Sequence, residues 1–172
     1  MKYLLRKFTQ IYYDSKIIDT LTPLNLPQYN INVRTSSDGI HQIYDRLRCK
    51  YVALTPEEWV RQHFIAFLID HKGYPLGLMA NEVSLSLNGT SRRCDTVVYN
   101  NLAQPMVLIE YKASSVKISQ KTFDQIVRYN MVFNAPFLIV SNGLEHYCCH
   151  IDLKNHSYKF LHDIPTYQNL WS

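Results

Sequence analysis

The sequence predicts one α/β domain, a three-layer sandwich in which helices flank a central mixed β-sheet and an extra N-terminal β-hairpin comes first. The prediction rests on a helix with a clear start signal at Thr55, on three strand-like segments after it, and on a second helix that leads into a compact apolar run. With 172 residues the chain has room for one core. We expect residues 21–172 to form this domain, with its core at about 55–165, and residues 1–20 to be a loosely attached extension.

Composition and charge exclude several classes of protein. With 47% hydrophobic residues, 19% charged residues and five glycines, the chain is neither disordered nor fibrous. Its longest apolar run, Phe64–Ile69, is far shorter than the about twenty residues that cross a bilayer, so we expect no membrane partner. The first residues lack a signal-peptide pattern and the four cysteines lack a CxxC pair, which favours a cytoplasmic protein with reduced thiols. A net charge of +4 permits a phosphate-bearing partner without specifying one.

The first expected elements are a hairpin and a helix. The segment Tyr29–Arg34 alternates as a half-buried strand would, and Ile40–Tyr44 can return after the turn TSSDG, which predicts the hairpin. Thr55 is a good N-cap, Pro56 suits the first helical position, and Gly73 ends the helix.

Two adjacent glutamates at the start of this helix are expected to differ. Glu58 stands three residues after Thr55, which is capping-box spacing, so it has a local role at the helix start. Glu57 stands seven residues before Phe64 and therefore lies on the apolar side of the helix. A carboxylate directed at an apolar boundary is costly unless it is paired or metal-bound.

Further strands and one more helix complete the expected sheet. The turns between the next three strand-like segments predict an antiparallel meander, and PFLIVS is typical of a strand buried on both faces. The expected strands are Ala80–Leu87, Arg93–Tyr99, Pro105–Lys112, Glu145–Asp152 and Ser157–His162, and the expected helix is about Thr122–Phe133.

Two acids and one amine fall at neighbouring strand ends. Side chains alternate along a strand, so Glu110 and Lys112 project from one face, and hairpin pairing can bring Asp95 opposite Glu110. Carboxylate oxygens are the ligands that Mg²⁺ prefers, and this ion keeps several waters for chemistry. The alternative interpretation is a salt-bridge cluster at a strand end.

These residues resemble a known family. Asp95, followed after a hairpin by Glu110, Tyr111 and Lys112, is similar to the D…ExK signature of the PD-(D/E)xK nuclease superfamily. The resemblance implies that the sandwich has the restriction-endonuclease-like fold.

Both predicted helices extend the resemblance. Gln125 and Tyr129 have the Q-x-x-x-Y spacing of the helicase-nuclease and type I restriction branch. Glu57, four residues before Arg61, is similar to the glutamate that accompanies the site from the first helix of that branch. Blocks such as TPEEWVRQHF, RRCDTVVY and LIVSNGLEHYCC, within roughly residues 24–155, together resemble the N-terminal nuclease domain of type I restriction enzyme R subunits.

The resemblance implies Mg²⁺-dependent hydrolysis of DNA phosphodiesters, with Mn²⁺ as a substitute ion. Asp95 and Glu110 would bind the metal, with the backbone carbonyl of Tyr111 as a third ligand. Lys112 would orient or polarise the attacking water and offset charge that builds on the phosphate.

Other residues would assist from the helices. Glu57 would support the metal, and Gln125 and Tyr129 would support the site from one side of their helix. Lys121 and Arg128 flank that side, which indicates a basic strip suited to a DNA backbone.

Other functions stay open at this point. Type I R subunits continue into an ATP-driven motor, but this sequence has no GxxxxGK[ST] loop for nucleotide phosphates. The chain is therefore a free-standing nuclease, a nuclease that needs separate restriction-system or motor subunits, or a non-catalytic DNA-binding or assembly module that retains the fold. A nuclease acting on RNA, or on branched or damaged DNA, is a further alternative.

Histidines and cysteines receive no functional role. Alternation would place His146, Cys148 and His150 of HYCCH on one strand face, but structural zinc sites use two separate ligand pairs and the second pair is missing. His63 and His71 are interpreted as packing or capping residues.

Overall fold

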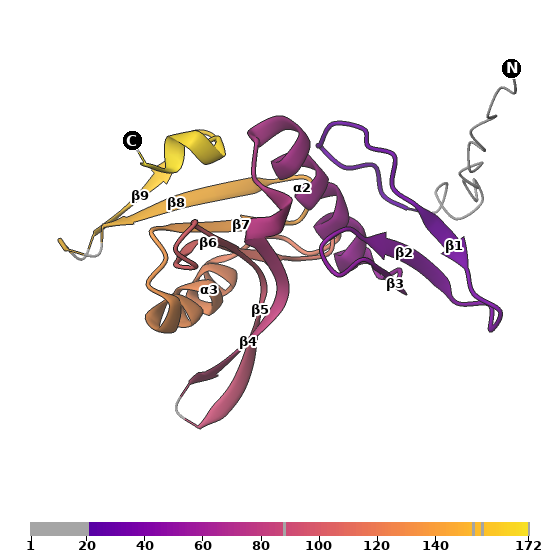
Figure 1. Cartoon of the computed structure of the whole chain (residues 1–172), viewed down its shortest axis with the longest axis horizontal. Coiled ribbons are helices and arrows are strands. Elements are labelled where there is room, and N and C mark those ends of the chain that lie inside the picture. The colour runs from indigo at the N-terminus through magenta and orange to yellow at the C-terminus, as the bar shows by residue number, and fades with distance from the viewer. Residues whose placement is uncertain (1–20, 88, 153, 156, 172) are drawn as a thin grey trace, which may run out of the picture.

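The computed structural model describes residues 21–87, 89–152, 154–155 and 157–171 (Figure 1). The extension expected at residues 1–20 lies outside the described residues. The described part contains two β-sheets, two α-helices and two short 3₁₀ helices, η1 (Leu76–Leu78) and η2 (Tyr167–Trp171). No helix in these ranges combines the length and the hydropathy that crossing a bilayer requires.

A small antiparallel sheet comes first. It contains β1 (Val33–Thr35), β2 (His41–Asp45) and β3 (Lys50–Ala53) in the order β1-β2-β3. The expected hairpin is therefore present, but its first strand is shorter than predicted and a third strand joins it. Val33 and Ile43 of this sheet pack against Trp59 of the following helix, which anchors the sheet through an apolar contact.

The central sheet has the predicted mixed character. Its strands follow one another in sequence order, and only β6 and β7 pair in parallel, whereas every other neighbouring pair is antiparallel. The expected meander is thus confirmed, and all of β7 is buried as predicted. The strands are β4 (Met79–Leu87), β5 (Thr90–Tyr99), β6 (Pro105–Tyr111), β7 (Phe137–Ser141), β8 (His146–Asp152) and β9 (Ser157–Leu161).

Helix α2 (Pro56–Lys72) begins and ends where the sequence predicts. The Thr55 hydroxyl accepts a hydrogen bond from the Glu58 backbone N–H at 3.1 Å. Gly73 adopts the left-handed conformation with φ 70°, which glycine takes without steric cost, and terminates the helix.

Helix α3 (Gln120–Phe133) makes the crossover between the parallel strands β6 and β7. It begins two residues before the predicted start because Ser119 and Thr122 form a capping box. It ends at Asn134, a residue type that tolerates the left-handed conformation observed there.

The two helices lie on opposite faces of the central sheet (Figure 1). Ile109 and Tyr111 of β6 pack in the apolar cluster that contains α2, whereas Leu108 packs in the cluster that contains Ile126 of α3. Because successive strand residues point to opposite faces, this alternation gives a helix, sheet and helix in three layers.

The turn between β7 and β8 holds the segment that precedes β1. In this turn the Asn142 side-chain oxygen accepts hydrogen bonds from the backbone N–H groups of Leu144 and Glu145. Gly143 has φ 81°. A Cβ at Gly143 would lie 2.7 Å from a methyl of Leu24 and 3.2 Å from Val60, so a larger residue would require the Leu24 side chain to shift. The Asn25 N–H donates to the Gly143 carbonyl at 2.8 Å and fixes this approach.

Candidate functional site

Strand register brings the predicted acids together. Thr96 of β5 pairs with Ile109 of β6, so the next level of the ladder sets Asp95 beside Glu110. The backbone N–H of Tyr111 donates a hydrogen bond to Asp95 Oδ2 at 2.8 Å, which fixes the orientation of this carboxylate. Two carboxylates from adjacent strands therefore share one end of the sheet.

Glu110 is the centre of a hydrogen-bonded cluster. Its side chain is buried, and Oε1 accepts from Lys112 Nζ at 2.8 Å and from Gln125 Nε2 at 2.6 Å. Gln125 Nε2 also lies 3.0 Å from the Tyr129 hydroxyl, and Lys112 Nζ lies 3.4 Å from Gln125 Oε1. The end of strand β6, with the residue that follows it, and helix α3 thus bring together four of the predicted site residues.

The local electrostatics favour a positive ion beside these acids. Burial, and then the neighbouring charge of Asp95, raise the pKa of Glu110 to about 7. Burial opposes the charge of Lys112, yet its hydrogen bond to Glu110 raises the pKa of this amine overall. Burial and Asp95 also raise the pKa of Glu57. Lys112 and Arg61 are thus the two cations beside the three carboxylates of Asp95, Glu110 and Glu57.

Arg61 is a site residue that the sequence analysis did not select for a role. Its Nη2 donates to Asp95 Oδ1 at 3.0 Å, and its Nη1 donates to Glu58 Oε2 at 3.1 Å. Only 7% of the Arg61 side chain is exposed, so burial strengthens both ion pairs. Its position four residues after Glu57 is the only feature of the sequence that points to Arg61, and this spacing does not predict its pairing with Asp95.

The structure confirms the local role of Glu58 at the helix start, but it is Glu58 and not Glu57 whose side chain is directed inward. The Glu58 backbone N–H does cap the helix start, but the Glu58 carboxylate is buried and accepts from Arg48 Nη2 at 3.2 Å and Gln62 Nε2 at 2.7 Å. Glu57 is the more exposed of the two, although its carboxylate is partly desolvated and close enough to Asp95 and Lys112 for their charges to act on its pKa. The reason is that Arg48, from the turn between β2 and β3, reaches the first turn of α2 and draws Glu58 inward.

The strand next to Asp95 is irregular. Asn81 pairs with Thr96 and Val83 pairs with Cys94, so the ladder between β4 and β5 skips the level of Glu82 and Asp95. Glu82 has φ 55°, an unfavourable conformation for a residue with a side chain. This conformation lets its carboxylate approach Arg48 Nη1 at 2.6 Å and Arg61 Nη1 at 3.7 Å. The irregularity thus surrounds Arg61 with acids.

The two residues predicted for DNA contact are on the outer side of α3. Lys121 and Arg128 are both exposed, and Arg128 Nε donates to the backbone carbonyl of Asp124 at 3.0 Å. They flank Gln125 and Tyr129 along the same helix, as their spacing predicts.

The donor chemistry suits a hard divalent cation that needs few protein ligands. Among the residues that the structure describes, no group of three His, Cys, Asp or Glu side chains is arranged to hold a metal ion. Asp95 and Glu110 are a pair of carboxylates in mutual repulsion, and Mg²⁺ is commonly held by one or two carboxylates while it keeps several waters. These two residues therefore fit Mg²⁺ better than they fit zinc.

The side chains of the HYCCH segment have packing and hydrogen-bonding roles. His146 Nδ1 lies 2.8 Å from the Ser141 hydroxyl, Cys148 is buried in the core, and the ring of His150 packs against that of Phe137.

Comparison with known proteins identifies the family to which the chain belongs. The family model for the type I restriction enzyme R protein N terminus matches residues 56–165, well over half of the chain. No curated protein matches the sequence.

A solved structure has a similar fold. It is described as a fragment of an HsdR subunit of a type I restriction enzyme from Vibrio vulnificus YJ016, with a TM-score of 0.52 and 17% sequence identity. The match covers 69% of this chain and 25% of that one, so this chain spans about a quarter of the solved fragment. At this identity the likeness concerns the fold alone, whereas the family follows from the matched residues that include α2, β5, β6 and α3. By that match, the chain belongs to the family of type I restriction enzyme R protein N termini.

Proposed function

We propose that this domain is a metal-dependent endonuclease of the PD-(D/E)xK type, with a restriction-endonuclease-like fold, that hydrolyses DNA phosphodiesters. The observation that carries the proposal is the buried Glu110 carboxylate, which lies beside Asp95 and accepts hydrogen bonds from Lys112 and Gln125. A buried acid with a strongly raised pKa and a specific charged partner is typical of a functional site. Membership of the R-subunit family supports the same conclusion.

Asp95 and Glu110 are the residues that would hold Mg²⁺ or Mn²⁺, with the Tyr111 carbonyl as a third ligand. When bound, such an ion supplies a Lewis acid that polarises a phosphoryl oxygen and lowers the pKa of a water. Arg61 holds Asp95 by one carboxylate oxygen, and the Tyr111 N–H holds it by the other. The Asp95 carboxylate is therefore held in a fixed orientation before any ion binds.

Lys112 is placed to act on the phosphate or on the attacking water. Its Nζ lies 2.8 Å from Glu110 Oε1, and its raised pKa keeps it protonated at neutral pH. A fixed positive charge at this point offsets the charge that develops on the phosphate. Gln125, itself in contact with Tyr129, holds the Glu110 oxygen that Lys112 contacts.

DNA is the expected substrate, and separate restriction-system or motor subunits are the expected protein partners. Lys121 and Arg128 stand exposed on α3 beside the site, where they would contact the phosphate backbone. Such contacts position a duplex without reading its sequence.

A second candidate function is a non-catalytic DNA-binding or assembly module. One observation favours it: both oxygens of the Asp95 carboxylate already accept hydrogen bonds, from Arg61 and from the Tyr111 N–H. A carboxylate held in this way has a structural role that needs no metal.

The decisive experiment is a plasmid assay. We expect the purified protein to nick or cut supercoiled DNA with Mg²⁺ or Mn²⁺, and to lose this activity in EDTA and in Lys112→Ala. Lys159→Ala, at an exposed position of β9, is the matched control and should cut at the wild-type rate. Plasmid that stays intact with the folded wild-type protein and either ion would contradict free-standing catalysis.

Calorimetry separates the two candidates. A catalytic site should bind Mn²⁺ and should lose this binding in Asp95→Asn. If Asp95 has a structural role alone, neither the wild-type protein nor the variant should bind the ion.

A further inference from the structure

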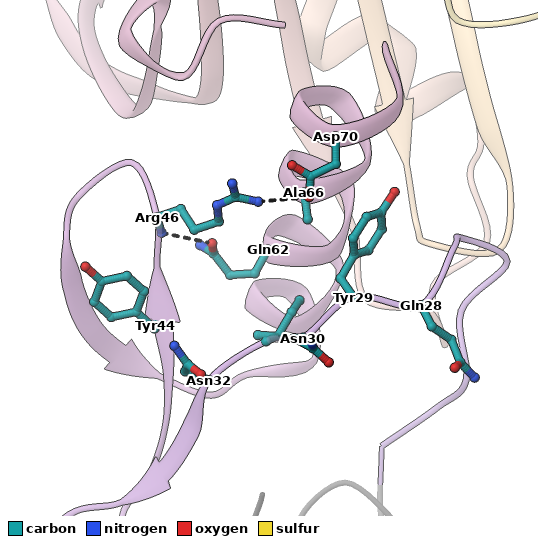
Figure 2. A pocket seen from close by; sticks show the side chains of 10 residues that line it. Gln28, Tyr29, Asn30, Asn32, Tyr44, Arg46, Gln62, Ala66 and Asp70 are labelled. Carbon is teal, nitrogen blue, oxygen red and sulfur yellow. Dashed lines mark hydrogen bonds and ion pairs between the residues drawn. The ribbon is translucent and has the colours of Figure 1, made fainter. Parts of the chain in front are cut away.

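A polar cavity lies on the other side of α2 from the sheet. It has a volume of about 600 Å³, within the range of ligand pockets, and is enclosed by the segment before β1, by β2 and by α2 (Figure 2). Gln62, Ala66 and Asp70 follow one another at four-residue spacing, so one face of α2 forms its rear wall.

The charges in this cavity cancel. Arg46 Nη1 donates to Asp70 Oδ2 at 3.2 Å, and the Arg46 backbone N–H donates to Gln62 Oε1 at 3.4 Å. Figure 2 draws both contacts across the upper part of the cavity. A wall with a closed ion pair favours a neutral polar ligand over a phosphate group.

Tyr29 contributes its ring to the wall rather than its hydroxyl. Within the described ranges, the Tyr29 hydroxyl oxygen is shielded from solvent and has no hydrogen-bond partner. Because a water cannot reach this oxygen, a ligand in the cavity would contact the Tyr29 ring and not the hydroxyl. Burial and the charge of Asp70 raise the pKa of Tyr29 to about 12, as expected for a phenol shut off from water.

The other lining groups have a distinct chemistry. The rings of Tyr29 and Tyr44 stand at opposite sides of the cavity, and the amide side chains of Asn30 and Asn32 lie between them at its lower edge (Figure 2). Aromatic rings stack on planar heterocycles, and the Asn32 amide offers the paired donor and acceptor that a base edge matches.

We propose that this cavity binds a nucleobase. Among planar polar heterocycles, the choice of a nucleobase rests on the proposed nucleic-acid function. The source we expect is a base of a single-stranded or unpaired segment rather than a free nucleotide, because stacking between aromatic side chains is how proteins hold unpaired bases.

The cavity is connected to the acidic site by a chain of hydrogen bonds. Gln62 Nε2 donates to Glu58 Oε1 at 2.7 Å, Arg61 contacts the second Glu58 oxygen, and Arg61 also holds Asp95. Gln62 and Arg61 are consecutive residues of α2, so a nucleic acid with a base in the cavity is bound at the same helix that anchors Asp95.

The test compares oligonucleotides with and without bases, in EDTA so that no cleavage occurs. We expect a labelled single-stranded oligodeoxynucleotide to bind roughly fivefold or more tightly than an abasic strand of equal length, by fluorescence anisotropy. Equal affinity for the two strands would mean that only the backbone is bound, and would overturn the proposal.

Variants locate the preference. Asn32→Leu and Tyr44→Ala should abolish the difference between the two strands, after circular dichroism has shown that each variant is folded. Tyr158→Ala removes an exposed tyrosine from β9, at the opposite end of the molecule in Figure 1, and should keep the difference. If both cavity variants still bound the strand with bases more tightly than the abasic strand, the proposed location would be overturned. If Tyr44→Ala does not fold, Asn32→Leu alone decides this point.

Two further arms separate the sources and the proposals. Binding of deoxynucleoside monophosphates that Asn32→Leu abolishes would show that a free nucleotide also occupies the cavity, whereas binding of the strand alone supports the expected source. Lys112→Ala should lose cleavage and keep the base preference. A wild-type protein that prefers bases but never cuts DNA would therefore refute the proposed catalysis and leave the nucleobase site standing.

Discussion

Arg61 and Asp95 form an ion pair between helix α2 and strand β5, with Arg61 Nη2 3.0 Å from Asp95 Oδ1. Only 7% of the Arg61 side chain and 20% of the Asp95 side chain are exposed. The contact joins the outer helix to the acidic end of the sheet and links the site to the Arg48, Glu58 and Glu82 cluster.

Loss of Arg61 should therefore destabilise the domain. Arg61→Leu leaves the carboxylates of Asp95 and Glu58 without their shared cation, and we expect the free energy of unfolding to fall by about 3–5 kcal/mol. Urea unfolding followed by circular dichroism measures this change. Asp163→Asn breaks the exposed pair with Lys72 and should cost less than about 1 kcal/mol. Similar losses in the two variants would contradict the role of Arg61.

Divalent-ion binding should strengthen as the pH rises through about 7. The pKa of Glu110 is raised to about 7, so near neutral pH this carboxyl is partly protonated and an ion must displace the proton. Calorimetric titration with Mn²⁺ at pH 6 and pH 8 should give tighter binding at pH 8 and proton release at pH 6. An affinity that stays constant over this range would show that Glu110 does not bind the ion.

Glu110→Gln should stabilise the metal-free protein at pH 8. Because burial and Asp95 raise the pKa of Glu110 from 4.5 to about 7, ionisation costs stability progressively as the pH rises between these values and fully above them. We expect a gain on the order of 2 kcal/mol at pH 8 that disappears near pH 4.5. Thermal unfolding of wild type and variant at both pH values measures it, and a gain of equal size at both would contradict the electrostatic origin.

Asp45→Asn should weaken the attachment of the small sheet. The buried Asp45 carboxylate accepts hydrogen bonds from the Leu47 and Arg48 backbone N–H groups, the Arg48 side chain and Asn81 Nδ2 of β4. Breaking this buried network should cost about 2–4 kcal/mol. Burial opposes ionisation of Asp45, but these bonds lower its pKa overall, so its contribution is fully present above the ordinary pKa near 3.8 and is lost as the pH falls from there through the lowered pKa. Urea unfolding at pH 7 and pH 3 should show a difference from wild type that shrinks at pH 3.

Gln125→Leu should reduce cleavage more than stability. The change removes the amide that holds Glu110 Oε1 and contacts Tyr129, and loss of such an orienting partner typically costs about 10–100-fold in activity. The plasmid assay measures the rate, and circular dichroism checks the fold. Gln120→Leu, one turn earlier on α3 and exposed, is the control that should retain full activity. Equal rates for the two variants would remove Gln125 from the proposed site.

The sequence predicts most of the fold because local signals and side-chain periodicity decide it. Thr55 and Gly73 delimit α2, and the alternation along β6 correctly sets Glu110 and Lys112 on one side and Tyr111 on the other. The cluster of Glu110, Lys112, Gln125 and Tyr129 was therefore within reach of pattern reasoning.

The parts that pattern reasoning misses depend on partners distant in sequence. Glu58 turns inward because Arg48, from the turn between β2 and β3, forms an ion pair with it. A helical projection of α2 alone does not include Arg48. The pairing of Arg61 with Asp95 joins positions that are 34 residues apart. Glu82 takes its left-handed conformation where the ladder skips a level, which no propensity of glutamate predicts.

Gly143 gives the chain an unexpected point of vulnerability. The missing side chain lets Leu24 rest on the β7–β8 turn, and the residues that continue from Leu24 become the floor of the Tyr29 and Asn32 cavity. A methyl group added at this hairpin would require the Leu24 side chain to move, even though the hairpin lines no part of the cavity. The packing of the segment that leads into the cavity thus depends on a glycine more than a hundred residues downstream.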